Sequence, residues 1–350
     1  MLKKFDHGGD IYSRHVDLDF SVNINPLGMP PEVRAALIEN TDRFDVYPDP
    51  QCRRLAAALS SFLGVPQDWI VFGNGAADVI IRLCLSGHPR RALICAPTFS
   101  EYEKAALMAG AAVDKYLLHE ENGFALGRGI FDALNRKPDL FFLCNPNNPT
   151  GCLTPAGLIA EIADFCESRD ITFVIDECFL SFTGEKSAAD LLKDHPHTVI
   201  LDAFTKMYSM AGLRLGFILC SSQELTARVR AFGQSWNVST PAQVAGLAAL
   251  GCGRQWIERT RKFTASETAC LRGRLRAMGL KVFDGAANYT LFKSSVPLTE
   301  PLLQRGILIR SCANYTGLSD QFYRVGIKTR EKNERLLAAL EDVLKGSDSR

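Results

Sequence analysis

The sequence has no excess of charge of either sign and no long apolar run. Its 350 residues contain 40 Lys and Arg against 39 Asp and Glu, so we expect neither nucleic acid nor a membrane surface as a partner. No stretch approaches the roughly 18 apolar residues of a membrane-spanning helix. The first residues, MLKKFDHGGDIYSRH, have no apolar run behind their lysines. We therefore expect no signal peptide and a cytoplasmic location.

Closely spaced cysteines are also missing. The eleven cysteines are scattered, none forms a CxxC pair, and several lie in apolar segments, such as Cys95 in RALICAP and Cys144 in LFFLCNP. A disulfide framework or a structural metal site usually shows short, fixed spacings. We interpret the cysteines as reduced, buried thiols of a cytosolic protein and expect no bound metal.

Short apolar segments alternate with helical patterns from about residue 68 onward. Such alternation is typical of an α/β fold with a mostly parallel sheet covered on both faces. Helical patterns occur in AADVIIRLCLSG (76–87) and in TPAGLIAEIADFCESR (154–169), where Thr154 is the expected cap. The seven strand candidates are WIVF (69–72), RALIC (91–95), AVDKYLL (112–118), DLFFLC (139–144), TFVID (172–176), TVILD (198–202) and RLGFIL (214–219).

One connection in this series is too short for a parallel crossover. Only 11 residues separate Asp202 from Arg214, whereas a parallel crossover needs about a dozen or more and usually contains a helix. We therefore expect one of the two flanking strands to run antiparallel to most of the sheet.

The pattern changes after about residue 250. A long polar helix (254–279) precedes four short strand candidates (KVFDG, NYTLFK, GILIR and FYRVGI) and a final helix, EKNERLLAALEDVLKG. With 47% hydrophobic residues the chain can bury a large core, and its length favours two unequal domains. We expect an irregular N-terminal arm at 1–30, a large domain at 31–250 and a smaller α+β domain at 251–350.

Polar clusters follow four of the strand candidates, at the carboxyl ends where open α/β sheets bind ligands. FGNGAAD (72–78) ends a strand and begins a helix near Ala76, which suits an anion at the backbone N–H groups, although an ordinary turn has the same pattern. CNPNNPTG (144–151) predicts a rigid loop with two amide side chains, or a surface turn. VIDECF (174–179) ends an apolar strand on Asp176, which acts as a cap or as a functional charge.

The fourth cluster, DAFTKMYSMAGLRLG (202–216), places a lysine and an arginine between two strands. A lone lysine is usually solvated, but the neighbours of Lys206 are mostly apolar. Such an environment lowers the pKa of an amine, as Schiff-base chemistry requires. Pyridoxal phosphate needs three groups together: a lysine that binds its aldehyde, a carboxylate that pairs with its ring nitrogen, and an anion cradle with an arginine that holds its phosphate.

These four motifs, in this order, resemble the aspartate-aminotransferase fold type of pyridoxal-phosphate enzymes, and within it the histidinol-phosphate-aminotransferase-like subgroup. The resemblance covers essentially the whole chain. It implies a homodimer, a seven-stranded large-domain sheet and a small C-terminal domain. Many relatives carry a tyrosine three residues after the aspartate; here Phe179 stands there, and it is also readable as plain core.

The roles that the resemblance implies are these. Lys206 forms the Schiff base and later moves protons at the substrate carbon, and Asp176 pairs with the pyridine nitrogen. Asn148 bonds the ring 3-oxygen, and Phe99 or Tyr102 stacks on the ring, with Phe99 favoured. Tyr47 reaches the cofactor phosphate of the neighbouring subunit. The cofactor phosphate is held by Gly75, Ala76, Thr205 and Arg214.

Two further segments resemble the L-threonine-O-3-phosphate decarboxylases of this subgroup. They are HGGDIY with DFSVNINPLGMP (19–30), and RGILIRSCANYTGLSDQFYRVGIKTREKNERLLAAL (305–340). This resemblance implies a lyase of cobalamin biosynthesis acting on a small phosphorylated amino acid. Arg324 is then the arginine for the substrate's acidic group. Arg310 and the His7–Gly8 arm grip the substrate phosphate, with Asn25 nearby. A disordered tail (for His7) and surface ion pairs (for the arginines) are the structural alternatives.

Two other functions stay open from the sequence. An aminotransferase for histidinol phosphate or another amino acid uses the same catalytic core, and the bond held perpendicular to the cofactor ring decides between the reactions. A non-enzymatic pyridoxal-phosphate-binding regulator carries an added DNA-binding domain, for which this chain has neither spare length nor a basic patch.

Overall fold

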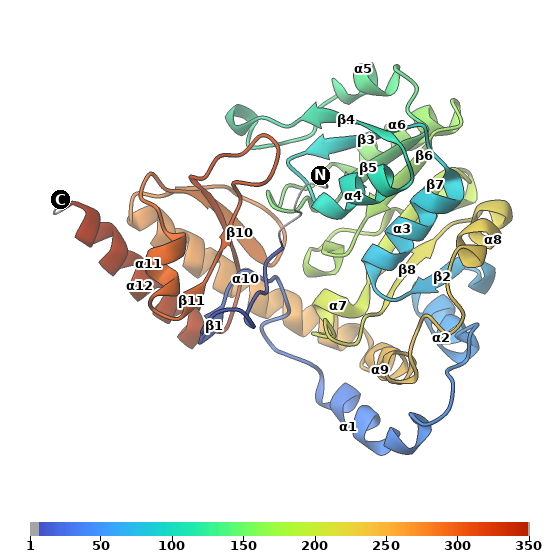
Figure 1. Ribbon diagram of the computed structural model, residues 1–350, viewed down its shortest axis with the longest axis horizontal. Coiled ribbons are helices and arrows are strands. Elements are labelled where there is room, and N and C mark those ends of the chain that lie inside the picture. The colour runs from blue at the N-terminus through green and yellow to red at the C-terminus, as the bar shows by residue number, and fades with distance from the viewer. Residues whose placement is uncertain (1–6, 349–350) are drawn as a thin grey trace.

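Seven strands form one sheet in the computed structural model of the protein, which describes residues 7–348 (Figure 1). The order in the sheet is β2-β8-β7-β6-β5-β3-β4. All seven strand candidates of the sequence are present. Their bounds are β2 (Ile70–Gly73), β3 (Arg91–Ala96), β4 (Ala112–Leu117), β5 (Leu140–Cys144), β6 (Thr172–Asp176), β7 (Thr198–Ala203) and β8 (Gly216–Leu219).

The strand after the short connection is reversed. β8 pairs antiparallel with both β2 and β7, whereas β3, β4, β5, β6 and β7 pair in parallel. The prediction of one antiparallel strand is confirmed. The connection contains only the four-residue helix α7 (Phe204–Met207), which carries Lys206.

Helices cover both faces of this sheet. Alternate strand residues belong to two different cores, because successive side chains point to opposite faces. Phe141 and Phe173 pack on the α2, α6 and α9 side, whereas Phe142 and Val174 pack on the α3, α4 and α8 side. The helices of this domain are α1 (Pro31–Glu39), α2 (Arg53–Leu63), α3 (Ala76–Gly87), α4 (Ser100–Met108), α5 (Ile130–Leu134), α6 (Ala156–Glu167), α7, α8 (Gln223–Ala231) and α9 (Thr240–Gly251).

One detail of the helix prediction is wrong. α6 begins at Ala156, and Pro155 rather than Thr154 occupies the cap position, without a capping hydrogen bond from a side chain. Thr154 is buried, and its N–H donates to Asn145 Oδ1 over 2.8 Å. Thr154 therefore ends the preceding loop instead of beginning the helix.

A second core lies in the C-terminal part of the chain, drawn in orange and red in Figure 1. Its strands form a four-stranded sheet in the order β12-β13-β10-β9. The long helix α10 leads into it from α9. The elements are α10 (Gly253–Ala277), β9 (Lys281–Val282), β10 (Tyr289–Lys293), α11 (Thr299–Leu303), β11 (Ile307–Leu308), β12 (Arg310–Ser311), β13 (Phe322–Gly326) and α12 (Arg330–Asp348).

The N-terminal arm joins this second core. Over its described residues, 7–30, the one strand is β1 (Leu18–Asp19), which pairs in parallel with β11. Leu18 and Phe20 are buried among the side chains of α10, α12 and the small sheet. The arm is thus irregular except at β1, where Leu18 and Phe20 bury apolar surface against the small domain. Among the described residues, no helix has both the length and the apolar character needed to cross a membrane.

Candidate active site

A cavity of about 420 Å³ lies where the carboxyl ends of the large-domain strands face the small domain. Most of the site residues predicted from the sequence line it. The predicted residues on its wall are His7, Gly8, Ala76, Phe99, Asn148, Asp176, Thr205, Lys206, Arg214, Arg310 and Arg324.

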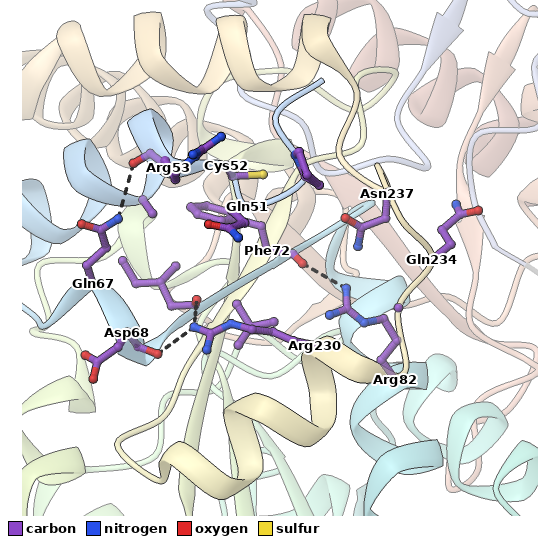
Figure 2. A pocket seen from close by; sticks show the side chains of 15 residues that line it. Gln51, Cys52, Arg53, Gln67, Asp68, Phe72, Arg82, Arg230, Gln234 and Asn237 are labelled. Atoms are coloured by element: carbon purple, nitrogen blue, oxygen red, sulfur yellow. Dashed lines mark hydrogen bonds between the residues drawn. The ribbon is translucent and has the colours of Figure 1, made fainter. Parts of the chain in front are cut away.

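A larger cavity, of about 610 Å³, lies elsewhere, between α2, β2 and α8. Figure 2 shows that two of its three arginines, Arg82 and Arg230, are directed to backbone carbonyls, and the third, Arg53, pairs with Asp49. Arg230 donates to the carbonyls of Asp68 and Ile70, and Arg82 to those of Phe72 and Val229. These charges serve the fold, so the larger volume does not mark the reactive site.

Lys206 projects into the smaller cavity from α7. Burial, together with the positive charge of Arg324, lowers the pKa of its amine from 10.5 to about 8. A substantial neutral fraction at physiological pH follows, and a neutral amine is the nucleophile that condenses with an aldehyde.

Asp176 lies at the end of β6, on the wall of the same cavity. The Tyr102 hydroxyl donates to its Oδ2, and the backbone N–H of Cys178 donates to its Oδ1 over 2.9 Å. Burial raises the pKa of this carboxyl, while the hydrogen bonds from Tyr102 and Cys178 act in the opposite direction. A buried carboxylate of this kind is stabilised by a cation placed against it, such as a protonated ring nitrogen.

The start of α3 and the side chain of Arg214 form an anion cradle. The guanidinium lies against Gly75, where a Cβ atom would stand 2.3 Å from Arg214 Nη2. Gly75 also has φ +83°, which side chains rarely adopt. Glycine at this position therefore lets the arginine and the first N–H groups of the helix approach one anion together.

Arg324 and Arg310 enter the cavity from neighbouring strands of the small domain. They are direct cross-strand partners in the β12–β13 pairing. Arg324 is 5% exposed, donates to Asn148 Oδ1, and donates from Nη2 to the carbonyl of Ser21 over 2.6 Å. Its Nε is buried without a hydrogen-bond partner among the described residues. Arg310 donates to Asn314 Oδ1 over 2.9 Å.

The structure separates the two aromatic candidates. Phe99 lines the cavity, but Tyr102 does not; its ring stacks on Phe142 at a centroid distance of 4.8 Å. Tyr102 is thus placed behind Asp176 and not over the expected ring. Phe179 is both core and wall: it lines the cavity and packs edge-on against Tyr289 at 5.0 Å.

Asn25 does not reach the cavity, so the expected substrate contact is replaced by a structural one. Its Nδ2 donates to the Met207 carbonyl over 2.7 Å and to Thr260 Oγ1 over 2.9 Å, beside the lysine-bearing helix. Asn23 lines the cavity instead, with a buried Oδ1 that has no hydrogen-bond partner among the described residues. The motif NIN contains both asparagines, and nothing in the sequence distinguishes them.

Tyr47 lies outside the cavity of its own chain. It is 78% exposed and stacks on Trp236 at a centroid distance of 4.5 Å. Sequence reasoning also missed two charged residues of α4, Glu101 and Lys104, which line the cavity. Their signal was weak, because charges in the first turns of a helix are usually solvated.

The chain was compared with known families, proteins and structures. Residues 16–340 match the family described as aminotransferase class I and II. The chain is 41% identical to threonine-phosphate decarboxylase of Salmonella typhimurium over 94% of this chain and 92% of that protein. It is 36% identical to histidinol-phosphate aminotransferase of Desulfitobacterium hafniense, over 92% of this chain and 91% of the relative.

Among solved structures, the crystal structure of histidinol-phosphate aminotransferase from Clostridium acetobutylicum superposes with a TM-score of 0.87 at 32% identity. The superposition covers 94% of this chain and 99% of that one. The fold, with its mostly parallel large sheet and small second domain, is therefore that of the aspartate-aminotransferase group.

Proposed function

The chain belongs to the class I and II aminotransferase family, which makes it a pyridoxal-phosphate-dependent enzyme, and we propose that it decarboxylates O-phospho-L-threonine. The products are (R)-1-amino-2-propanol O-2-phosphate and CO2, and the pathway is cobalamin biosynthesis. The relative of 41% identity is a threonine-phosphate decarboxylase. The expected cytoplasmic location stays a prediction.

The residues present fit the cofactor. Lys206 offers an amine of lowered pKa, Asp176 offers a buried carboxylate, and Arg214 lies in the cradle that only a glycine at position 75 permits. When bound, pyridoxal phosphate supplies an electron sink for the bond that breaks at the substrate's α-carbon. We propose that Asp176 faces the ring nitrogen and that Thr205, Ala76 and Arg214 hold the cofactor phosphate.

The pairing of Arg310 with Arg324 carries the substrate assignment. Like charges directly opposite each other on a strand ladder are destabilising, and here both guanidinium groups line one cavity. Anions bound between or beside them offset that cost. O-Phosphothreonine has two, a carboxylate and a phosphate, and a guanidinium binds either through paired hydrogen bonds.

We assign the carboxylate to Arg324 and the phosphate to Arg310 and His7. The unpartnered Nε of Arg324 supports the first assignment, because a buried donor without an acceptor is costly and a carboxylate satisfies it. Asn148 already accepts from Arg324 through its Oδ1, so toward a ligand it acts through its NH2 group. An arginine that fixes the carboxylate also fixes which α-carbon bond is oriented for cleavage.

We propose that Lys206 transfers the proton that the substrate's α-carbon needs. After CO2 leaves, the α-carbon needs one proton, and an amine with a pKa of about 8 both accepts and donates protons near neutral pH. The cavity wall beside it is apolar at Phe179 and Ala203, which limits water around the reacting carbon.

The direct test is purified enzyme with pyridoxal phosphate and O-phosphothreonine, without an amino acceptor. We expect release of CO2 with stoichiometric aminopropanol phosphate. The second candidate, a histidinol-phosphate aminotransferase, is favoured by the fold match and by the 36% identical relative. Transfer of the amino group from histidinol phosphate to 2-oxoglutarate, without CO2 from phosphothreonine, would overturn the proposal.

We further propose that the active unit is a homodimer in which Tyr47 contacts the cofactor phosphate of the partner subunit. The exposed stack of Tyr47 on Trp236 supports this, because large exposed aromatic surfaces mark contact sites. Sedimentation should show a dimer. Tyr47→Phe should weaken cofactor binding but leave the dimer intact. A stable monomer with full activity would contradict the proposal.

A further inference from the structure

A short piece of the N-terminal arm, residues 7–9, forms one wall of the active-site cavity together with Ser21 and Glu101. His7, Gly8, Ser21 and Glu101 all line it. These residues come from three separate parts of the sequence. Specific contacts must therefore hold the arm in place, since a chain end not tied down is usually poorly ordered.

Four contacts hold residues 7–9 of the arm in place. His7 Nε2 lies 2.8 Å from Glu101 Oε1, and the His7 ring packs near Phe99 at a centroid distance of 5.8 Å. The Gly9 N–H donates to Ser21 Oγ over 2.7 Å. Between them, Gly8 lies so close to Ser21 that a Cβ atom would stand 2.5 Å from the Ser21 carbonyl oxygen. Only glycine permits this approach.

Glu101 is the unexpected member of this wall. Its side chain is 7% exposed, and it is an acid on the wall of a cavity that also contains Arg310, Arg324 and Lys104. Its partners are His7 and, at 3.3 Å, Lys104. The hydrogen bond from His7 is the largest influence that holds the pKa of Glu101 below its usual value. The negative charge of an acid beside a site for anions repels the ligand, so the presence of Glu101 here calls for a separate structural role.

We propose that Glu101 is a positioning residue that fastens the His7–Gly9 segment over the cavity and orients the His7 ring toward the phosphate of the substrate. This inference rests on the proposed function. A carboxylate at Nε2 requires the ring to donate there, so His7 meets a ligand through Nδ1. A charge-assisted hydrogen bond to a phosphate oxygen is stronger than one between neutral groups, so this contact contributes to substrate affinity.

The wall is also connected to the proposed carboxylate site. Ser21 accepts from Gly9 through its hydroxyl and from Arg324 through its carbonyl, the latter over 2.6 Å. Ser21 is thus a hydrogen-bond partner both of the segment that Glu101 holds and of Arg324, the arginine proposed for the carboxylate. Glu101 therefore acts on substrate affinity, and the cofactor contacts proposed for Asp176, Lys206 and Arg214, which lie on other elements, stay unchanged.

The kinetic test compares Glu101→Ala, His7→Ala and the double variant in the holoenzyme with O-phosphothreonine. We expect each single variant to raise KM about 10-fold with kcat within about 2-fold, and the double variant to be no worse than the singles, because residues in one contact are not additive. Glu101→Gln keeps an oxygen that accepts from His7 and should recover most of the affinity. Additive losses, or a fall in kcat with loss of the cofactor absorbance band, would overturn the inference.

The matched control is Glu103→Ala. Glu103 belongs to the same helix but pairs with Lys115 at 2.9 Å and does not line this cavity. Its removal should leave KM for phosphothreonine unchanged. An equal rise in KM would show that any charge on α4 matters, and would refute a specific role of Glu101.

Hydrogen exchange separates this inference from the proposed function. In the substrate-free holoenzyme, Glu101→Ala should speed exchange in a peptide that covers residues 7–13, which contains the bonded Gly9 amide, and Glu103→Ala should not. If Glu101→Ala folds poorly, His7→Ala repeats the test, because it removes the same hydrogen bond at its more exposed partner. Unchanged exchange overturns the inference whatever the substrate is. No CO2 from the wild type refutes the proposed function, and the exchange result then decides on Glu101 alone.

Discussion

The two sides of the active-site cavity are built differently. The side that fits the cofactor comes from one domain: Asp176 ends β6, Lys206 follows β7, and Arg214 precedes β8, which are three adjacent strands. The side proposed for the substrate combines His7 of the arm with Glu101 of the large domain and Arg310 and Arg324 of the small one. One side is local to a sheet edge, and the other is an assembly of distant segments.

This difference has a functional consequence. The cofactor side uses a geometry that every parallel sheet offers, so the same constellation supports many reactions. The substrate side decides which molecule binds and which bond is oriented. Substitutions on the two sides should therefore have separable effects, on the cofactor spectrum and on KM.

The largest effect is expected on the cofactor side. Lys206→Ala should abolish the absorbance band of the Schiff base between Lys206 and the cofactor, and lower the rate by at least about 10³-fold, since acid–base catalysis alone contributes about 10² to 10⁴. Borohydride treatment of the wild type should attach the cofactor to Lys206, as peptide mass spectrometry would show. Lys115→Ala is the control that keeps the band. Tagging of another lysine would refute the site.

On the substrate side, Arg324→Ala should leave the band in place and raise KM for phosphothreonine about 100-fold, because removing one partner of a buried charged pair costs about 2–5 kcal/mol. Arg324→Lys should recover little, since an ammonium lacks the planar fork of donors. The exposed Arg305 of the same domain, changed to Ala, is the control. Simultaneous loss of the band would mean that the two sides are not separable.

The next effect concerns stability without the cofactor. Because burial lowers the pKa of Lys206 to about 8, the unfolded chain binds more protons between about pH 8 and 10, and the stability contributed by this group rises with pH there. Lys206→Met should therefore be more stable than the wild-type apoenzyme at pH 7, by a margin that shrinks by about 2 kcal/mol toward pH 10. Urea unfolding at several pH values measures it. A margin independent of pH would contradict burial of a charged amine.

The smallest effect is expected for Tyr102, which lies outside the cavity and contacts Asp176 of the cofactor side. Tyr102→Phe removes the hydroxyl that donates to Asp176, and a hydrogen bond to a charged group contributes about 1.5–3 kcal/mol. We expect about a 10-fold loss of kcat, with KM little changed. A change mainly in KM would place Tyr102 on the substrate side instead.

The sequence was informative where a motif is local. Gly75, Asp176 and Lys206 each lie in a short segment at a predicted strand end, and the alternation of strands and helices placed those ends together. The connection of 11 residues predicted that one of its two flanking strands is antiparallel, and the structure shows that this strand is β8. The roles of these residues came from resemblance, since the same polar clusters also occur in plain turns.

The sequence was uninformative where the outcome depended on distant packing. The prediction from the sequence named Asn25, whereas the fold turns its neighbour Asn23 to the cavity and Asn25 to Met207 and Thr260. The sequence offered both Phe99 and Tyr102 for the cofactor ring, with Phe99 favoured, and only the stacking of Tyr102 on Phe142 placed that residue behind Asp176. Neighbouring residues of one motif share their local signals, so their separate roles depend on partners elsewhere in the chain.

By itself the sequence determined the layered α/β architecture, because apolar periodicity and connection length act over short stretches of chain. It also named Lys206, Asp176 and the segment around Gly75 as candidates for the lysine, the acid and the anion site. Only the tertiary structure decided that His7 meets Glu101, 94 residues away, and that Arg310 and Arg324 share one cavity. Such contacts form when whole elements pack, and no local pattern encodes where a side chain of one element meets another.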